Sequence, residues 1–204
     1  MSLRKDDLAR YDRAYFDRWY RDPETRVKSG AAIRRKAALA LSVAEYYLER
    51  PVRTVLDAGC GEGNWLPALR SLRPGIRYTG VDASSYAVKR FGKKRNIRLG
   101  SFATLEEIGL AEEYDLIICS DTLFYLPIEE LEQGLGSLAH RTAGVAFLEL
   151  YTGEDSLVGD FPKEGLQSAV SYRRMLRRHG FLSVGSHCYL GPDIAERAME
   201  MEHC

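Results

Sequence analysis

The chain has 204 residues, of which 45% are hydrophobic and 28% charged, a composition typical of globular domains and unlike that of disordered or membrane-embedded chains. Lys plus Arg and Asp plus Glu both total 29, so the formal net charge is zero and no overall basic field would attract nucleic acid. The sequence has no apolar run near the roughly 20 residues of a membrane span, no apolar stretch of a secretory signal, and four widely spaced cysteines, which predicts a cytoplasmic protein with reduced thiols.

The first fifty residues predict two helices separated by a turn. Tyr11, Tyr15 and Trp19 recur every four residues, which indicates a short amphipathic helix with an aromatic face. Pro23 disfavours a helical residue before it and therefore favours a turn over 22–25. A second apolar stripe with helical spacing runs from Ile33 to Leu48. We expect residues 1–50 to form a helical cap within the same globular unit as residues 51–204.

After residue 53, short apolar runs alternate with helical stretches, the pattern of buried parallel strands joined by crossover helices. The expected strands are 54–58, 77–81, 97–99, 116–119 and 144–150. The expected helices are 65–72, 85–94, 105–110 and 128–139. This alternation predicts an α/β fold, a doubly wound, mostly parallel Rossmann-like sheet with helices on both faces.

The C-terminal third continues with a long polar segment, 151–167, which is a candidate lid because ordinary connections are shorter. A helix over 169–179 ends at Gly180, and one strand is expected over 181–189. Residues 191–204 contain no clear closing strand, which leaves a seventh strand of the sheet in doubt.

The stretch 55–65 is the most informative, because a buried strand runs into a glycine loop and then a helix. Gly59, Gly61 and Gly63 allow tight turning and close approach of a ligand, and the helix start offers unpaired N–H donors. A dinucleotide fingerprint would place its third glycine at position 64, which is Asn64 here. The spacing therefore ranks a nicotinamide oxidoreductase below other nucleotide-binding functions.

Residues 57–63, Asp-Ala-Gly-Cys-Gly-Glu-Gly, resemble the first motif of the class I S-adenosylmethionine-dependent methyltransferases. Asp82 at the end of the second strand and the segment 114–126 extend the resemblance in register over 54–150, roughly half the chain. The resemblance implies a methyltransferase with S-adenosylmethionine as its cofactor. Asp82 would accept hydrogen bonds from the ribose hydroxyls, with a helix N-cap as the alternative role for this residue.

The other cofactor contacts follow from the resemblance and from the aromatic helix. Ala83 would lie along the adenine, and Ser101 replaces the acidic residue that the family usually has near the adenine amino group. Trp19 would cover the sulfonium by cation–π attraction, and Arg26 would pair with the cofactor carboxylate, although packing alone also explains the aromatic spacing. The predicted cofactor-binding residues are Asp57, Gly59, Cys60, Gly61, Asp82, Ala83, Ser101, Phe102, Ser120, Asp121, Trp19 and Arg26.

Methyl transfer from a sulfonium has an excellent leaving group, so alignment and exclusion of water supply much of the acceleration. A general base is needed only when the acceptor arrives protonated. The catalytic candidates are Tyr125, Asp121 and Glu149, with Tyr151 beside them, and the alternative for each is a role in shaping the pocket.

A small-molecule acceptor is favoured, because the chain is barely larger than a catalytic core and has no appended recognition domain. A methyltransferase of nucleic acid or protein is the alternative that local arginine clusters keep open, and a non-catalytic S-adenosylmethionine-binding regulator is another. A zinc site at His187, Cys188, His203 and Cys204 is discounted, since neighbouring residues on a strand face opposite ways, and no metal is expected.

Overall fold

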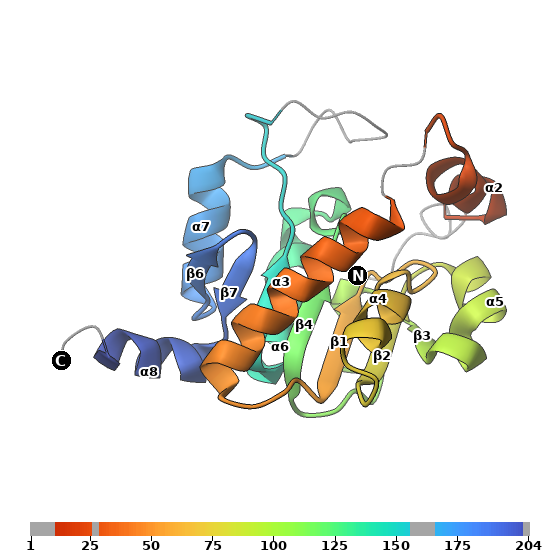
Figure 1. The fold of residues 1–204 in the computed structure, drawn as a ribbon. Coiled ribbons are helices and arrows are strands. Elements are labelled where there is room, and N and C mark those ends of the chain that lie inside the picture. The colour runs from red at the N-terminus through yellow and green to blue at the C-terminus, as the bar shows by residue number, and fades with distance from the viewer. Residues whose placement is uncertain (1–10, 26–28, 156–165, 202–204) are drawn as a thin grey trace.

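A computed structural model describes residues 11–25, 29–155 and 166–201, and it contains one sheet of seven strands in the order β3-β2-β1-β4-β5-β7-β6 (Figure 1). The strands are β1 (Thr54–Ala58), β2 (Arg77–Asp82), β3 (Ile97–Leu99), β4 (Tyr114–Cys119), β5 (Thr142–Leu148), β6 (Leu182–Gly185) and β7 (Cys188–Leu190). The first five strands are parallel to one another, and β7 is antiparallel to both β5 and β6.

The centre of the sheet is formed by β1 and β4, where the strand order reverses. Every residue of β4 is buried, as are all but the first residue of β1, which explains why these strands are continuous apolar runs in the sequence. Ligands of open α/β sheets bind outside the carboxyl ends of the strands at such a reversal. A ligand site is therefore expected at the segments that follow β1 and β4.

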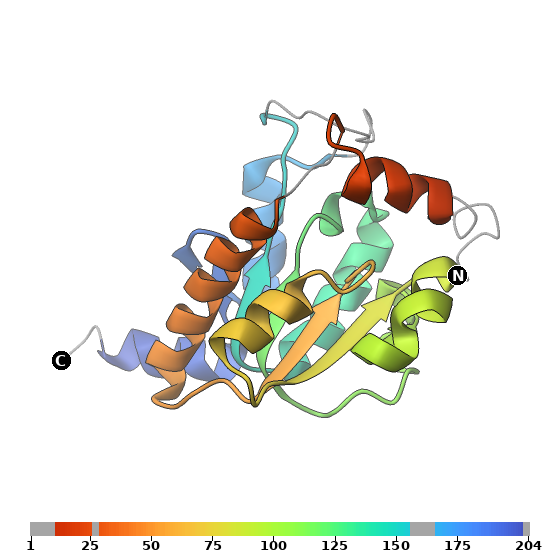
Figure 2. The ribbon, with the colours of Figure 1, turned by 45° about the vertical axis from the view of Figure 1, so that its right-hand side comes forward.

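Helices cover both faces of the sheet, as the sequence predicts (Figure 2). One core joins the sheet to α3 (Gly30–Leu48), α4 (Trp65–Leu72) and α8 (Pro192–Met201). The opposite core joins it to α6 (Ile128–Arg141) and α7 (Ala169–Arg178). Helix α5 (Ser85–Arg95) packs along β2 and β3 at one edge. None of the described helices is long and apolar enough to cross a membrane.

The aromatic N-terminal segment is helical, as expected, but it is not a uniform α-helix. It begins as α2 (Arg13–Phe16), capped by the Asp12 carboxylate, and widens into a π-helical turn, η1 (Asp17–Arg21). The expected turn follows it over 22–25. Figure 2 shows this segment crossing above the carboxyl ends of β1 and β2.

The predicted helix over 105–110 is wrong. Only a short 3₁₀ helix, η2 (Phe102–Thr104), forms there, and turns follow it. The Arg98 guanidinium donates to the carbonyl oxygens of Ile108 and Gly109 at 3.2 and 2.7 Å, so these carbonyl groups have a hydrogen-bond partner outside a helix. Burial of Leu105 in the core supplies the apolar contact that looked like a helical stripe.

The single strand predicted over 181–189 is also wrong, because the chain folds back within it. Ser186 and His187 adopt left-handed backbone angles, φ 49° and 64°, and join β6 to β7 in a tight hairpin. Strand β7 then pairs with β5 and completes the sheet. The seventh strand, which the sequence left in doubt, is therefore present, and residues 192–201 form α8 instead of a strand.

Candidate functional site

The loop after β1 is shaped by glycines that no other residue could replace without displacing a neighbour. Gly59 and Gly61 have φ angles of 75° and 54°. A Cβ atom on Gly59 would lie 2.4 Å from the Thr122 side chain, and one on Gly61 would lie 2.4 Å from the Tyr20 hydroxyl. The Gly59 N–H donates to the Val81 carbonyl oxygen at 2.8 Å, which fixes the loop beside the end of β2. These contacts explain the glycine motif physically.

Asp82 ends β2 and faces this loop. Its Oδ2 accepts from the Gly61 N–H at 2.6 Å, and its Oδ1 accepts from the Ser84 N–H at 2.8 Å. The N-cap of α5 is Ser84, whose hydroxyl oxygen accepts from the Ala87 N–H at 3.1 Å, so Asp82 does not hold the cap position. Burial raises the pKa of Asp82, and the two backbone donors oppose that shift. Each carboxylate oxygen keeps a lone pair for a further donor.

Asp57 lies beneath the loop and is 1% exposed. Its Oδ2 accepts from the Tyr78 hydroxyl at 2.7 Å. Burial raises the pKa of Asp57 to about 7, the Tyr78 hydrogen bond lowers it, and the charge of Asp82 raises it. Two carboxyl groups therefore border one end of the site.

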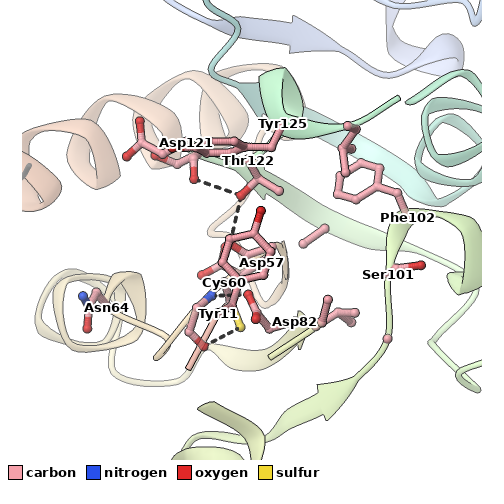
Figure 3. A pocket seen from close by; sticks show the side chains of 18 of the residues that line it. Tyr11, Asp57, Cys60, Asn64, Asp82, Ser101, Phe102, Asp121, Thr122 and Tyr125 are labelled. Atoms are coloured by element: carbon pink, nitrogen blue, oxygen red, sulfur yellow. Dashed lines mark hydrogen bonds between the residues drawn. The ribbon is translucent and has the colours of Figure 1, made fainter. Parts of the chain in front are cut away.

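A cavity of about 330 Å³ opens between the strand ends and the N-terminal aromatic segment (Figure 3). All predicted cofactor-binding residues that the structure describes line it, namely Asp57, Gly59, Cys60, Gly61, Asp82, Ala83, Ser101, Phe102, Ser120, Asp121 and Trp19. Tyr125 lines it too. Glu149 is not among its lining residues, and Arg26 lies outside the described residues.

The N-terminal segment supplies an aromatic wall and is fastened at two points. Tyr11, Tyr15 and Phe16 line the cavity together with Trp19 and Tyr20. The Ser84 hydroxyl donates to the Tyr11 carbonyl oxygen at 2.6 Å. Arg21 Nη2 donates to Glu62 Oε1, also at 2.6 Å, so the segment is tied to the glycine loop by an ion pair.

Sequence reasoning found the aromatic residues of this wall by their spacing of four, but it missed the Arg21–Glu62 pair. The two residues are 41 positions apart, and no local pattern relates them. The Trp19 ring already has the Arg18 guanidinium 4.8 Å from its centre, which occupies part of the surface that the cation–π prediction assigns to a ligand.

Ser101 and Phe102, which follow β3 in the sequence, line another part of the cavity. The Ser101 hydroxyl oxygen is buried and has no hydrogen-bond partner among the described residues. A Cβ atom on Gly134 of α6 would lie 2.2 Å from the Phe102 ring, so this glycine lets the ring pack against the helix. A buried polar atom without a partner costs free energy unless a ligand or water satisfies it.

The catalytic candidates cluster after β4 and β5, but not all reach the cavity. Asp121, in a left-handed conformation with φ 60°, and Tyr125, in the 3₁₀ turn η3 (Leu123–Tyr125), both line it. Glu149 is 3% exposed and pairs with Lys36 of α3. The Tyr151 hydroxyl lies 3.4 Å from Asp121 Oδ1 and from Glu149 Oε1, and burial, followed by these two charges, raises its pKa.

The cysteines give no sign of a metal centre in the described part of the chain. Cys60, Cys119 and Cys188 are free and buried. Cys188 at the start of β7 is buried, while His187 in the preceding turn is exposed. No group of three or more His, Cys, Asp or Glu side chains suited to a metal ion occurs among residues 11–25, 29–155 and 166–201.

Comparison with known proteins places this geometry in a recognisable group. A family model described as a methyltransferase domain matches residues 31–190. No curated protein sequence is significantly similar to the chain. An S-adenosylmethionine-dependent methyltransferase from Archaeoglobus fulgidus superimposes with a TM-score of 0.62 and 18% identity, over 83% of this chain and 74% of that one.

Two further solved structures have similar folds. The magnesium protoporphyrin IX methyltransferase of Synechocystis, solved with S-adenosylhomocysteine, gives a TM-score of 0.58 and 21% identity, over 86% of this chain and 88% of that one. The N-methyltransferase NodS from Bradyrhizobium japonicum was also solved with S-adenosylhomocysteine. It superimposes with a TM-score of 0.60 and 17% identity, over 88% of this chain and 97% of that one. At these identities the comparison establishes a shared fold.

Proposed function

The chain belongs to the class I S-adenosylmethionine-dependent methyltransferases, and from this membership we propose that it transfers a methyl group from S-adenosylmethionine to a small-molecule acceptor in the cavity above β1 and β4. The observation that carries the proposal is the contact between the Gly61 N–H and Asp82 Oδ2, which joins the glycine motif to the acidic strand end at the cavity wall.

The residues present suit this cofactor. The Asp82 carboxylate has lone pairs left for two ribose hydroxyls after its backbone donors are counted. The unpartnered Ser101 hydroxyl would meet the adenine, with Ala83 and Phe102 against the ring faces. Cys60, Gly59 and Asp57, which line the cavity, would lie near the methionine end. Asp121 and Ser120 would lie on its other side, and Arg26 remains a proposed partner of the carboxylate.

When bound, S-adenosylmethionine would supply a methyl group on a positively charged sulfur, and this sulfur would be the group displaced when an acceptor attacks the methyl carbon in line. The work left to the protein is alignment and exclusion of water. The aromatic wall formed by Tyr11, Tyr15 and Trp19 would exclude water, since these side chains line the cavity from the N-terminal segment that crosses above the strand ends. Asp121 and Tyr125 are the described candidates to receive a proton from an acceptor that arrives protonated.

Several features support a small-molecule acceptor. The cavity is lined largely by aromatic and aliphatic side chains with a few polar groups, as small-ligand sites usually are. The N-terminal segment occupies the space above the strand ends, where a macromolecular substrate would have to approach. The buried free cysteines agree with the proposed cytoplasmic location, where thiols stay reduced.

Substitution of Asp82 tests the cofactor site. We expect Asp82→Ala to weaken S-adenosylmethionine binding by roughly 1.5 to 3 kcal/mol, about tenfold to hundredfold in Kd, because a hydrogen bond to a charged group is lost. Asp82→Asn should lose less, since its amide oxygen still accepts a bond. Both variants also weaken the bonds to Gly61 and Ser84, so calorimetric titration must accompany melting curves. Native-like affinity in a destabilised Asp82→Ala protein would refute the ribose role.

A further inference from the structure

Glu149 and Lys36 meet behind the cavity wall that follows β4, and we propose that they are positioning residues which hold residues 120–122 in the conformation that binds the cofactor. The sequence alone groups Glu149 with candidate bases and assigns Lys36 no role. The inference rests on the proposed function, because the affinity that it concerns is that for S-adenosylmethionine.

The Glu149 carboxylate, just after β5, joins the segment after β4 to α3. The Ser120 hydroxyl, just after β4, donates to Glu149 Oε2 at 2.6 Å. Lys36 Nζ, from α3, pairs with Oε1. The Glu149 N–H donates to the Cys119 carbonyl oxygen at 2.9 Å, so the carboxylate is held beside the end of β4 by its own backbone. Charge-assisted bonds of this kind are the stronger ones in proteins, and the carboxylate is almost wholly buried.

The segment that Glu149 contacts includes a residue in the left-handed region. Asp121 adopts φ 60°, which is uncommon for residues with a Cβ atom, although Asp adopts it more readily than most. The Thr122 hydroxyl donates to the Gly59 carbonyl oxygen at 3.1 Å, and the Thr122 side chain fills the space that a side chain on Gly59 would need. A shift at Ser120 would therefore reach the glycine loop itself.

The same carboxylate also fixes the neighbouring walls. The Tyr151 hydroxyl lies between Glu149 and Asp121, 3.4 Å from each carboxylate. Lys36 lies one turn after Ile33 on α3, and Ile33 lines the cavity. Glu149 thus contacts Ser120, which lines the cavity, and the helix that carries Ile33, although it does not line the cavity itself.

The test compares Glu149→Gln with Glu45→Gln by calorimetric titration of S-adenosylmethionine and by thermal melting. Glu45 lies on α3 as well and pairs with Arg73 away from the cavity, so its loss affects the fold alone. We expect Glu149→Gln to raise Kd about tenfold, the size expected for loss of a hydrogen bond to a charged group, while Glu45→Gln lowers Tm and leaves Kd unchanged.

Ser120→Ala supplies a second variant, which removes the hydroxyl and leaves the Lys36 pair in place. If Glu149 acts through Ser120, this variant should also raise Kd, and Glu149→Gln added to it should raise Kd little further. Fully additive effects, or equal losses of affinity in Glu149→Gln and Glu45→Gln, would overturn the positioning role. Should Glu149→Gln fail to fold, an unchanged Kd in Ser120→Ala overturns it. A wild-type protein that binds no S-adenosylmethionine would instead contradict the proposed function.

Discussion

At the scale of single residues, two glycines with left-handed backbone angles, one in the loop after β1 and one in the turns after η2, differ in what surrounds them. Gly61 and Gly109 both have left-handed backbone angles, φ 54° and 64°. A side chain on Gly61 would collide with the Tyr20 hydroxyl, whereas nothing lies within 4 Å of the corresponding position on Gly109. A side chain at either position would strain the backbone, but only one at Gly61 would also collide with a neighbour.

We predict that Gly61→Ala and Gly109→Ala each destabilise the protein by about 1 to 2 kcal/mol, the cost of the left-handed conformation in a residue with a Cβ atom. Only Gly61→Ala should also weaken S-adenosylmethionine binding, because its methyl group displaces Tyr20 from the cavity wall. Melting curves and calorimetric titration check the two effects. Equal affinity in both variants would show that the contact with Tyr20 is irrelevant to binding.

The raised pKa of Asp57 gives a prediction on pH. An unfolded Asp titrates near 3.9, whereas burial moves the folded pKa of Asp57 to about 7. Between these values the folded state binds more protons than the unfolded state, so this group makes stability fall as pH rises. We expect the difference in unfolding free energy between Asp57→Asn and the wild type to move in favour of the variant from pH 4 to pH 8. Chemical denaturation at several pH values measures it, and a constant difference would contradict the assignment.

At the scale of elements, the central strands could be predicted from sequence because each is a short apolar run buried on both faces. The predicted bounds of β1, β3 and α4 are those observed. The helix expected over 105–110 failed because the apolar residues there, such as Leu105, are buried by tertiary contacts and not by a helix. The β6–β7 hairpin was missed because its turn uses Ser186 and His187 in place of the usual Asn and Gly.

The candidate site could be predicted in the same uneven way. The glycine motif and Asp82 are recognisable because a strand end, a loop and a helix start are adjacent in sequence. The contacts of Arg21 with Glu62 and of Lys36 with Glu149 join residues 41 and 113 positions apart. Such pairs depend on how the cap and α3 pack over the sheet, and no local signal encodes them. Arg26, which the sequence predicts to bind the cofactor, lies outside the described residues.

The attachment of the aromatic segment to the glycine loop predicts a role in cofactor retention. Arg21→Ala removes the ion pair with Glu62 and should raise Kd for S-adenosylmethionine about threefold to tenfold, with little change in Tm, because Arg21 is 39% exposed. Arg13→Ala is the matched control, since the ion pair of Arg13 within the described residues is with Asp17 on the same segment. Deletion of the residues before Lys28 should leave a folded core and weaken binding further. Unchanged affinity in the deletion would make the segment a packing element only.

At the scale of the whole molecule, the two apolar cores hold the sheet from both faces, and the cavity at the carboxyl ends of the strands is lined in part by residues of both cores, such as Ile33 and Phe102. Only the folded chain brings these residues together, so the binding free energy adds to the stability of the native state. Any ligand that binds the folded chain alone should raise the melting temperature by mass action.

We predict that S-adenosylmethionine and S-adenosylhomocysteine both raise Tm, while NAD and NADP do not. At a ligand concentration of one hundred times Kd the stabilisation is about 2.7 kcal/mol, and each kcal/mol moves Tm by roughly 2 to 4 °C in a chain of this size, so a shift of roughly 5 to 11 °C is expected. The glycine spacing favours the sulfonium cofactor, since Asn64 stands where a dinucleotide fold needs its third glycine. Thermal melting with each ligand over a series of concentrations measures the shift.

The shift must grow with ligand concentration and shrink in Asp82→Ala, because both follow from binding at this site. A shift with NAD alone would contradict the cofactor assignment. Equal shifts with all four ligands would indicate a site that binds the shared adenosine group and makes no specific contact with the sulfonium.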